Sequence, residues 1–272
     1  MHALPKAGLS DLVRTAETMA DAAARVTLKY FRSDALEAAN KDREGGFDPV
    51  TLADEGSEQA MRDVLAAQRP EDGIFGEEFA NVSGTSGLTW VLDPIDGTRA
   101  FISGMPVWGT LIALDDGNAG VLGIIDQPYI GERFVGHLGD STAAWLERNG
   151  KRQRISARPC ATLDEAVFYT TDPYLFSDDE ASAFTALRAR ARLTRFGTDC
   201  YAYALLAGGH VDLVVESGLA AYDIAAHIPL IKAAGGIVTD WQGADCRWGG
   251  RVIAAGDARV HSEALEILSR VP

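Results

Sequence analysis

The chain has 272 residues, of which 47% are hydrophobic and 24% charged, close to the average for globular proteins. This composition excludes a disordered, collagen-like or coiled-coil chain. Its 39 acidic residues exceed the 25 basic ones and give a net charge of −14, which argues against a broad nucleic-acid or anionic-membrane surface because such surfaces need clustered positive charge. Any anionic ligand must therefore be attracted locally.

The periodicity of the apolar residues predicts a long amphipathic helix from Ser10, its expected N-cap, to about Phe31. A looser stretch from Asn40 to Val50 is expected to form a loop, and a second helix is expected over Leu52 to Gln68. Short apolar runs that read as strands then follow at 74–75, 88–92, 107–114, 121–125 and 132–137. The first of these runs is followed by Gly76-Glu77-Glu78 and the second by Asp93, and strands that deliver carboxylates at their ends are a common way to build a site on a rigid scaffold.

The second half of the chain alternates between strand and helix patterns. Strands are predicted at 167–170, 193–196 and 211–215, helices at about 178–191, 199–207, 222–234 and 259–270, and two short strands before the last helix. Such alternation indicates layered α/β packing. We expect two subdomains, residues 1–150 and 151–272, with a soft boundary between Arg148 and Arg158.

The cysteines and the N-terminus indicate a compartment. Cys160, Cys200 and Cys246 are odd in number and form no Cys-x-x-Cys pair, which is typical of free thiols in a reducing compartment. Charged residues from Lys6 to Arg25 interrupt any apolar signal segment, and no stretch approaches the roughly 18 apolar residues of a membrane span. We therefore expect a cytoplasmic protein without a membrane anchor.

The most informative segment is Trp90-Val91-Leu92-Asp93-Pro94-Ile95-Asp96-Gly97-Thr98. An apolar run ends in two carboxylates three residues apart, with Pro94 stiffening the turn between them. Hard carboxylates at a rigid corner suit Mg²⁺, which prefers oxygen ligands and often shares its site with a substrate phosphate. The backbone N–H groups at the start of the short helix expected after Gly97 favour an anion at the same point.

A single Asp-x-x-Asp is also compatible with a solvated turn, so its neighbours matter. Further acids stand at comparable places: Asp54 near the start of the second helix, Glu77 after a strand and Asp223 at the head of an apolar helix. Asp223 alone is equally consistent with an N-terminal helix cap. Taken together, the acids indicate a metal site.

Three motifs resemble those of the inositol monophosphatase family, in the family's order: Gly76-Glu77-Glu78, Asp93-Pro94-Ile95-Asp96-Gly97-Thr98, and Tyr222-Asp223-Ile224-Ala225-Ala226 followed by Ala233-Ala234-Gly235-Gly236. The resemblance covers nearly the whole chain. It implies the layered αβαβα sugar-phosphatase fold, Mg²⁺ dependence, phosphomonoester hydrolysis and a homodimer. Two departures put the third-metal geometry in doubt: Tyr222 replaces the family's usual tryptophan, and Asp42 to Phe47 match the usual loop poorly.

The resemblance also assigns roles. It implies that one ion binds Glu77, Asp93 and the carbonyl of Ile95, that a second binds Asp93, Asp96 and Asp223, and that a third, weaker ion lies near Glu77. It further implies that Asp54 and Thr98 pair to orient or deprotonate the attacking water, and that the amides of Gly97 and Thr98 hold phosphate. Lys41 matches less securely a family lysine near the metal waters, and a solvated loop lysine is the alternative.

Substrate choice is expected to depend on the second half of the chain. Residues 197–207 and 211–219 are similar to the plant and proteobacterial histidinol-phosphatase branch. Asp199 and Glu216, with Asp223, are the candidate substrate-binding acids, because histidinol phosphate carries an ammonium group and an imidazole. Two alternatives stay open: Asp199 as a simple helix cap, and Glu216 as an acceptor for the hydroxyls of inositol-1-phosphate or another small phosphomonoester.

Other features are weaker. The five histidines, His2, His137, His210, His227 and His261, are dispersed and read as ordinary surface or satisfied core residues. Arginines 188 to 195 form a basic run, interpreted as a solvated face, with Arg195 a possible contributor to a dimer or to the substrate edge. Some family members act as partners of the transcription machinery, but the intact set of candidate catalytic acids argues against a purely non-catalytic role.

Overall fold

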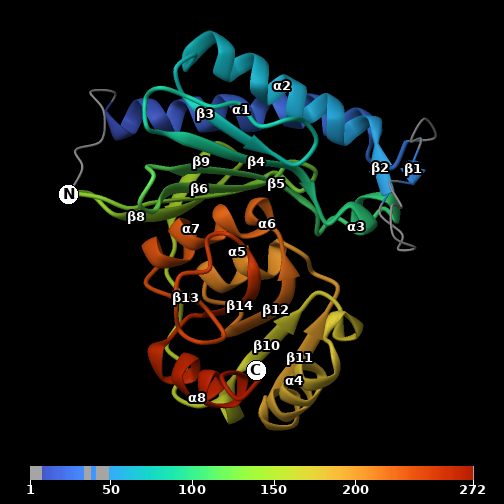
Figure 1. Ribbon diagram of the computed structural model, residues 1–272, viewed down its shortest axis with the longest axis vertical. Helices are drawn as coiled ribbons and strands as arrows, with labels where there is room; N and C mark the ends of the chain where they lie inside the picture. Colours follow the sequence, from blue (N-terminus) through green and yellow to red (C-terminus); the bar gives the residue numbers. More distant parts are fainter. Residues whose placement is uncertain (1–7, 34–37, 41–48, 272) are drawn as a thin grey trace.

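A computed structural model describes residues 8–33, 38–40 and 49–271, and the predictions for Lys41 and Asp42 to Phe47 lie outside these ranges. The chain forms five layers, with two helices over a large sheet, three short helices in the middle, a smaller sheet, and two outer helices (Figure 1). This arrangement confirms the predicted αβαβα fold. Among the described residues, no helix combines the length and apolar character needed to cross a membrane.

The outer helices of the first layer are α1 (Leu9–Tyr30) and α2 (Leu52–Gln68). The apolar face of α1, from Leu12 to Ala23, is buried, as its helical periodicity predicts. The predicted cap at Ser10 is wrong. Gly8 is the N-cap and Ser10 is exposed within the first turn, so the helix begins before the polar residue that appeared in the sequence as its start signal.

The large sheet has seven strands in the order of the chain, and only its first pair is parallel. Its strands are β3 (Gly73–Gly76), β4 (Thr89–Asp96), β5 (Gly109–Asp115), β6 (Gly120–Gln127), β7 (Glu132–His137), β8 (Ala143–Arg148) and β9 (Lys151–Arg154). The hairpin β8–β9 was not predicted, although Asn149 and Gly150 both have positive φ and Asn-Gly is a strong hairpin signal. The subdomain boundary at residue 150 stays a prediction, and it falls within this hairpin.

The small sheet has the order β11-β10-β12-β14-β13. Its strands are β10 (Val167–Thr170), β11 (Leu193–Phe196), β12 (Leu213–Leu219), β13 (Ile237–Asp240) and β14 (Gly250–Ala255), and its outer helices are α4 (Asp178–Arg190) and α8 (Ala258–Leu268). A separate two-stranded sheet joins β1 (Ala38–Asn40) to β2 (Pro49–Thr51), and two 3₁₀ turns lie at Leu163–Glu165 and Pro173–Leu175.

The helix predicted over 222–234 is divided into α6 (Ala221–Ala225) and α7 (His227–Ala233). Pro229 gives a physical reason, because it lacks the backbone N–H that a continuous helix would donate to the carbonyl of Ala225. With α5 (Tyr201–Ala207), these helices form the middle layer between the two sheets (Figure 1).

Two glycines let the middle layer lie close to the large sheet. A Cβ atom added at Gly123 would come within 1.9 Å of the carbonyl oxygen of Ala226, and one at Gly136 within 2.3 Å of the Cα atom of Leu230. Side chains at these two positions are therefore excluded by the backbone of the helices. The close approach sets the height of α6, which carries Asp223, above the sheet.

Candidate active site

The parallel pair β3–β4 brings two candidate ligands together at one sheet edge. Gly76 is paired with Leu92, and the N–H of Glu77 donates to the carbonyl of Leu92 at 3.2 Å. Glu77 and Asp93 are thus the next residues along adjacent strands. Their carboxyl groups interact, and each affects the pKa of the other.

A bulge in β4 turns Asp93 and Asp96 to the same side. In a regular strand, residues three apart face opposite sides of the sheet. The register against β5 shifts between these two residues, and the carbonyl of Pro94 inside the bulge accepts a hydrogen bond from the buried hydroxyl of Thr110 at 2.8 Å. The bulge therefore converts a three-residue spacing into a pair of convergent carboxylates.

Asp223 completes the cluster from α6. Carboxylate oxygens of Asp93, Asp96 and Asp223 all lie within 4.8 Å of one another. Asp96 Oδ2 accepts from the N–H of Cys200 at 2.7 Å, and Asp223 Oδ2 accepts from the N–H of Ala220 at 2.7 Å. Asp223 is thus both a helix cap and a cluster member, and the two interpretations of its sequence position are compatible.

The electrostatics of the cluster suit a cation. Burial and the neighbouring carboxylates raise the pKa of Glu77 to about 8 and raise those of Asp93 and Asp96. Burial raises the pKa of Asp223 to about 6. Asp93 Oδ1 is buried and has no hydrogen-bond partner in the part of the chain that the structure describes. A set of buried oxygen donors that repel one another and leave an acceptor unsatisfied fits a hard divalent ion.

Gly97 and Thr98 lie where β4 ends and α3 (Thr98–Ile102) begins. Gly97 has φ +79°, and a Cβ atom there would come within 2.9 Å of the Cβ atom of Asp199, so glycine is required for both the turn and the contact. The hydroxyl of Thr98 donates to the carbonyl of Ile95 at 3.1 Å. The pairing of Thr98 with Asp54, which is buried in the first turn of α2, stays a prediction.

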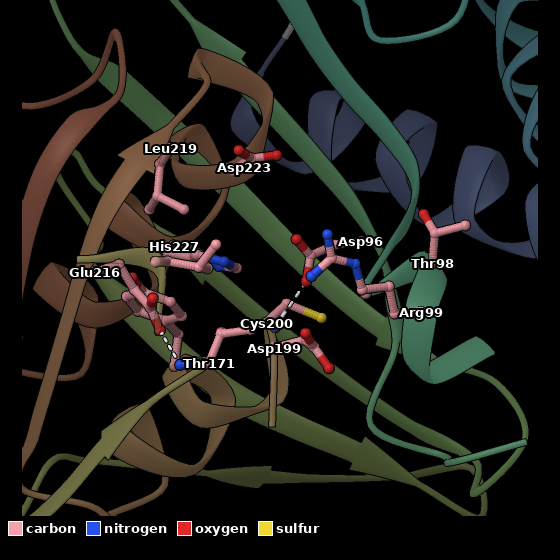
Figure 2. A pocket seen from close by; sticks show the side chains of 13 residues that line it. Asp96, Thr98, Arg99, Thr171, Asp199, Cys200, Glu216, Leu219, Asp223 and His227 are labelled. Atoms are coloured by element: carbon pink, nitrogen blue, oxygen red, sulfur yellow. Dashed lines mark hydrogen bonds between the residues drawn. The ribbon is translucent and has the colours of Figure 1, made fainter. Parts of the chain in front are cut away.

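A cavity of about 290 Å³ opens beside the cluster, between the two halves of the chain. Figure 2 shows Asp96 and Asp199 on one side of it and Glu216 and His227 on the other. Its lining includes six of the predicted site residues: Asp96, Gly97, Thr98, Asp199, Glu216 and Asp223. Arg195 lies outside this lining, exposed on the edge strand β11.

Glu216 is buried at the inner end of the cavity. Its carboxylate accepts from the N–H of Thr171 at 2.6 Å (Figure 2) and from the hydroxyl of Thr170 at 3.2 Å. Burial is the largest influence on this group and raises its pKa to about 7, although the bonds from Thr171 and Thr170 oppose the shift. β12 runs to Leu219, beyond the predicted end at Val215, so Glu216 is held by sheet pairing.

Asp199 lies before α5 and outside its cap position. The helix begins at Tyr201 with Cys200 as N-cap, so the predicted helix start at Asp199 is wrong. Asp199 has φ +42°, a left-handed backbone that is unusual for a residue other than glycine and is typical of functional sites. Burial raises the pKa of its carboxyl to about 6, although Arg99 lowers it in part.

Sequence reasoning missed several residues of the cavity, and His227 is the clearest case. Its ring stacks on Tyr203 with centroids 4.2 Å apart, and burial lowers its pKa to about 3. His227 Nδ1 and the hydroxyl of Tyr203 are buried without a partner among the described residues, so the expectation of a satisfied core histidine is wrong. Its spacing of four residues from Asp223, one helical turn, was the available signal.

Residues 9–271 match the inositol monophosphatase family. The chain therefore belongs to this family of metal-dependent phosphatases, which act on small phosphomonoesters. The fold and the acidic cluster agree with that membership.

Similar proteins of known name span most of the chain. The bifunctional phosphatase IMPL2 of Arabidopsis thaliana is 43% identical over 261 residues, which are 92% of this chain and 72% of the plant protein. A histidinol-phosphatase of Chlorobaculum parvum is 36% identical over 83% of this chain and 84% of its own length. The structure of an inositol monophosphatase from Zymomonas mobilis has a TM-score of 0.82 and 43% identity, covering 97% of this chain and 100% of that one.

Proposed function

We propose that this protein hydrolyses L-histidinol phosphate to L-histidinol and phosphate with the help of Mg²⁺. The observation that carries the proposal is the convergence of Asp199 and Glu216 on the cavity that also contains Asp96 and Asp223. A substrate with a phosphate at one end and a cationic group at the other matches this lining, because carboxylates form strong charge-assisted hydrogen bonds with ammonium and imidazolium groups. The name of the Chlorobaculum relative supports the same substrate.

The residues at the sheet edge would hold the metal ions. In this proposal Glu77, Asp93 and the carbonyl of Ile95 hold one Mg²⁺, Asp93, Asp96 and Asp223 hold a second, and a third, weaker ion lies near Glu77. When bound, such ions lower the pKa of a water molecule and neutralise charge on the phosphoryl oxygens. The raised pKa values of these acids mean that the protein itself does not compensate their charge.

The remaining steps belong to side chains and amides of the chain. Asp54 and Thr98 orient the attacking water and accept its proton, and the N–H groups of Gly97 and Thr98 donate to the phosphate oxygens. The leaving alcohol is bound at the other end by Asp199 and Glu216. Glu216, with Thr170 and Thr171 already fixing its carboxylate, provides a preorganised acceptor for a cationic group.

Inositol-1-phosphate is the second candidate substrate. It is favoured by the Zymomonas mobilis structure, whose protein is called an inositol monophosphatase and is 43% identical to this chain. A buried carboxylate such as Glu216 also accepts hydrogen bonds from hydroxyl groups.

Phosphate release from the two substrates decides between them. We expect kcat/KM for histidinol phosphate to exceed that for inositol-1-phosphate by about tenfold or more, as one charge-assisted hydrogen bond of about 1.5 to 3 kcal/mol predicts. Faster hydrolysis of inositol-1-phosphate would exclude the histidinol assignment. Loss of both activities on chelation, with recovery on addition of Mg²⁺, tests the metal requirement.

Three further proposals accompany this function. They are a homodimer, a cytoplasmic location, and a division into subdomains at residue 150 in which the second subdomain selects the substrate. A role as a partner of the transcription machinery is the less favoured alternative. Asp54, Glu77 and the other candidate catalytic acids have no evident use in a protein that only binds other proteins.

A further inference from the structure

The loop that follows β3 is fixed by one buried carboxylate from α2. Glu58 is fully buried, and its Oε2 accepts from the N–H of Glu78 at 2.7 Å while its Oε1 accepts from the N–H of Phe79 at 3.3 Å. These two amides immediately follow Glu77. A side chain on one element thus binds the backbone of another at the point where Glu77 leaves the sheet.

Arg62, one turn further along α2, completes this arrangement. Its Nε and Nη2 both lie 2.8 Å from Glu58 Oε1, and its Nη2 donates to the carbonyl of Phe79 at 3.2 Å. The guanidinium group also lies over the ring of Phe79, 5.6 Å from the centroid. A buried carboxylate is tolerated only with such compensation, so the charge of Glu58 is balanced here without a metal ion.

Gly76 lets the carboxylate approach the loop. A Cβ atom added at Gly76 would come within 2.1 Å of Glu58 Oε1 and 2.8 Å of Arg62 Nη2. Any other residue at this position would push Glu58 away from the amides. Glu58 also lies one helical turn after Asp54, so the same face of α2 supports the loop of Glu77 and carries Asp54.

We propose that Glu58 is a positioning residue for the metal site, which holds the loop at residues 76–79 so that the carboxylate of Glu77 faces Asp93. This role rests on the proposed function, because it assumes that Glu77 binds a metal ion. Glu58 itself contacts neither substrate nor ion. Outer partners of this kind orient ligands, and their loss typically weakens metal binding by about 10- to 100-fold.

The substitution Glu58→Gln tests the proposal. Glutamine keeps the size of the side chain, but it offers only one oxygen acceptor to the two backbone N–H groups of Glu78 and Phe79. Its NH₂ group is a donor and would face one of these N–H groups, which is also a donor. We expect the dissociation constant for Mn²⁺, measured by electron paramagnetic resonance on the purified protein without substrate, to rise about tenfold. The Mg²⁺ concentration for half-maximal phosphatase activity should rise in parallel, while kcat at saturating Mg²⁺ stays within about threefold of the parent.

Gly76→Ala displaces the same contact from the loop side and serves as the second variant. Gly76 has no positive φ, so the added methyl group acts through its clash with Glu58 rather than through backbone strain. Asp63→Asn is the matched control on the same helix. Asp63 is exposed, and its carboxylate accepts a hydrogen bond from the side chain of Gln59, its one hydrogen-bond partner among the residues that the structure describes. The control should bind Mn²⁺ as the parent does.

The outcomes separate the two proposals. If folded Glu58→Gln or folded Gly76→Ala binds Mn²⁺ as tightly as the parent does, the proposed positioning role of Glu58 is overturned. The proposal of a metal site is not affected by that result. Failure of both variants to fold, judged by circular dichroism, assigns Glu58 to stability and likewise overturns it. A parent protein that binds no Mn²⁺ contradicts the metal site on which the proposed function depends.

Discussion

The buried acids around the cavity differ from those in the supporting layers. Outside the cavity, Asp212 is held by Arg158 at 2.6 and 2.7 Å and accepts from the N–H of Val167 at 2.8 Å. Asp72 accepts from Arg69 at 2.7 Å and from the indole of Trp90 at 2.9 Å. In the acidic cluster beside the cavity, burial raises the pKa of Glu77 to about 8 and also raises that of Asp93.

The contrast is visible at and just before one strand, β12. Asp212 lies just before β12 and Glu216 lies four residues later, and both are almost fully buried. Asp212 has an arginine as partner, whereas Glu216 is held by Thr170 and Thr171 and faces the cavity. In the proposed function, acids whose charge the protein itself compensates stabilise the fold, and the acids of the site bind an external cation. Each substitution below should separate the two classes.

The largest effect is expected for Asp93→Asn. This change removes a carboxylate that we assign to both principal metal ions, so Mg²⁺-dependent phosphatase activity should fall by more than about 100-fold, beyond the loss typical of outer partners. The melting temperature without metal should stay equal or rise, because a neutral amide relieves repulsion by Glu77 and Asp96. Activity assays and calorimetry with and without Mg²⁺ measure both. Surviving activity would refute the metal model.

Glu216→Gln should act on substrate choice. We expect kcat/KM for histidinol phosphate to fall by about 10- to 100-fold, which corresponds to one charged hydrogen bond of about 1.5 to 3 kcal/mol. Hydrolysis of a small phosphomonoester without a cationic group, such as phenyl phosphate, should change by less than about threefold. A uniform loss for both substrates would place Glu216 among the supporting acids instead.

Asp212→Asn is the counterpart from the compensated class. The free energy of unfolding should fall by about 2 kcal/mol, because the paired bonds to Arg158 and the bond from Val167 are weakened. Turnover per folded molecule should match that of the parent. Urea denaturation and active-site-normalised kinetics test these two expectations, and a selective change in KM for histidinol phosphate would contradict the division into classes.

The smallest effect concerns pH and Asp72. Burial acts to raise the pKa of this group, but hydrogen bonds from Arg69, Ser86 and Trp90 outweigh it and hold the pKa below the usual 3.8. The folded protein therefore binds fewer protons than the unfolded chain near pH 4. The contribution of Asp72 to the free energy of unfolding is therefore present above about pH 4. It is lost as the pH falls through the pKa of Asp72 in the folded protein.

Asp72→Asn should remove this dependence at a cost of about 1 kcal/mol at neutral pH. The difference in unfolding free energy between parent and variant, from denaturation at pH 7, 5 and 3, should shrink toward zero at the lowest pH. If the difference in unfolding free energy stays constant over this pH range, the ion pair with Arg69 is not the source of the stabilisation by Asp72.

Much of this site could be predicted because its residues are local in sequence. The segment from Asp93 to Thr98 places two acids, a proline and a helix start within six residues, and adjacent parallel strands bring Glu77 to it. The sequence also predicted α2 and β11 with the observed bounds. The bulge that makes Asp93 and Asp96 converge, in contrast, depends on the register with β5, which no local pattern encodes.

The less local parts were missed for physical reasons. His227 is one histidine in an apolar helix, and its place in the cavity depends on stacking with Tyr203 from another helix. The support of Glu77 by Glu58 joins residues 20 positions apart through backbone amides, which carry no sequence signature. The break at Ala226 was overlooked because the apolar spacing continues through it.

The contact of Gly123 and Gly136 with the backbone of Ala226 and Leu230 has a consequence for exchanging parts between relatives. Asp223 comes from the second half of the chain, but its distance from Asp93 depends on two positions in the first half that lack side chains. A chimera that joins residues 1–150 of another family member to residues 151–272 of this one keeps its metal site only if both glycines are retained. Residues 151–272 therefore require a first half that fits them. Substrate preference can be transferred only together with the face of the large sheet on which α6 and α7 pack.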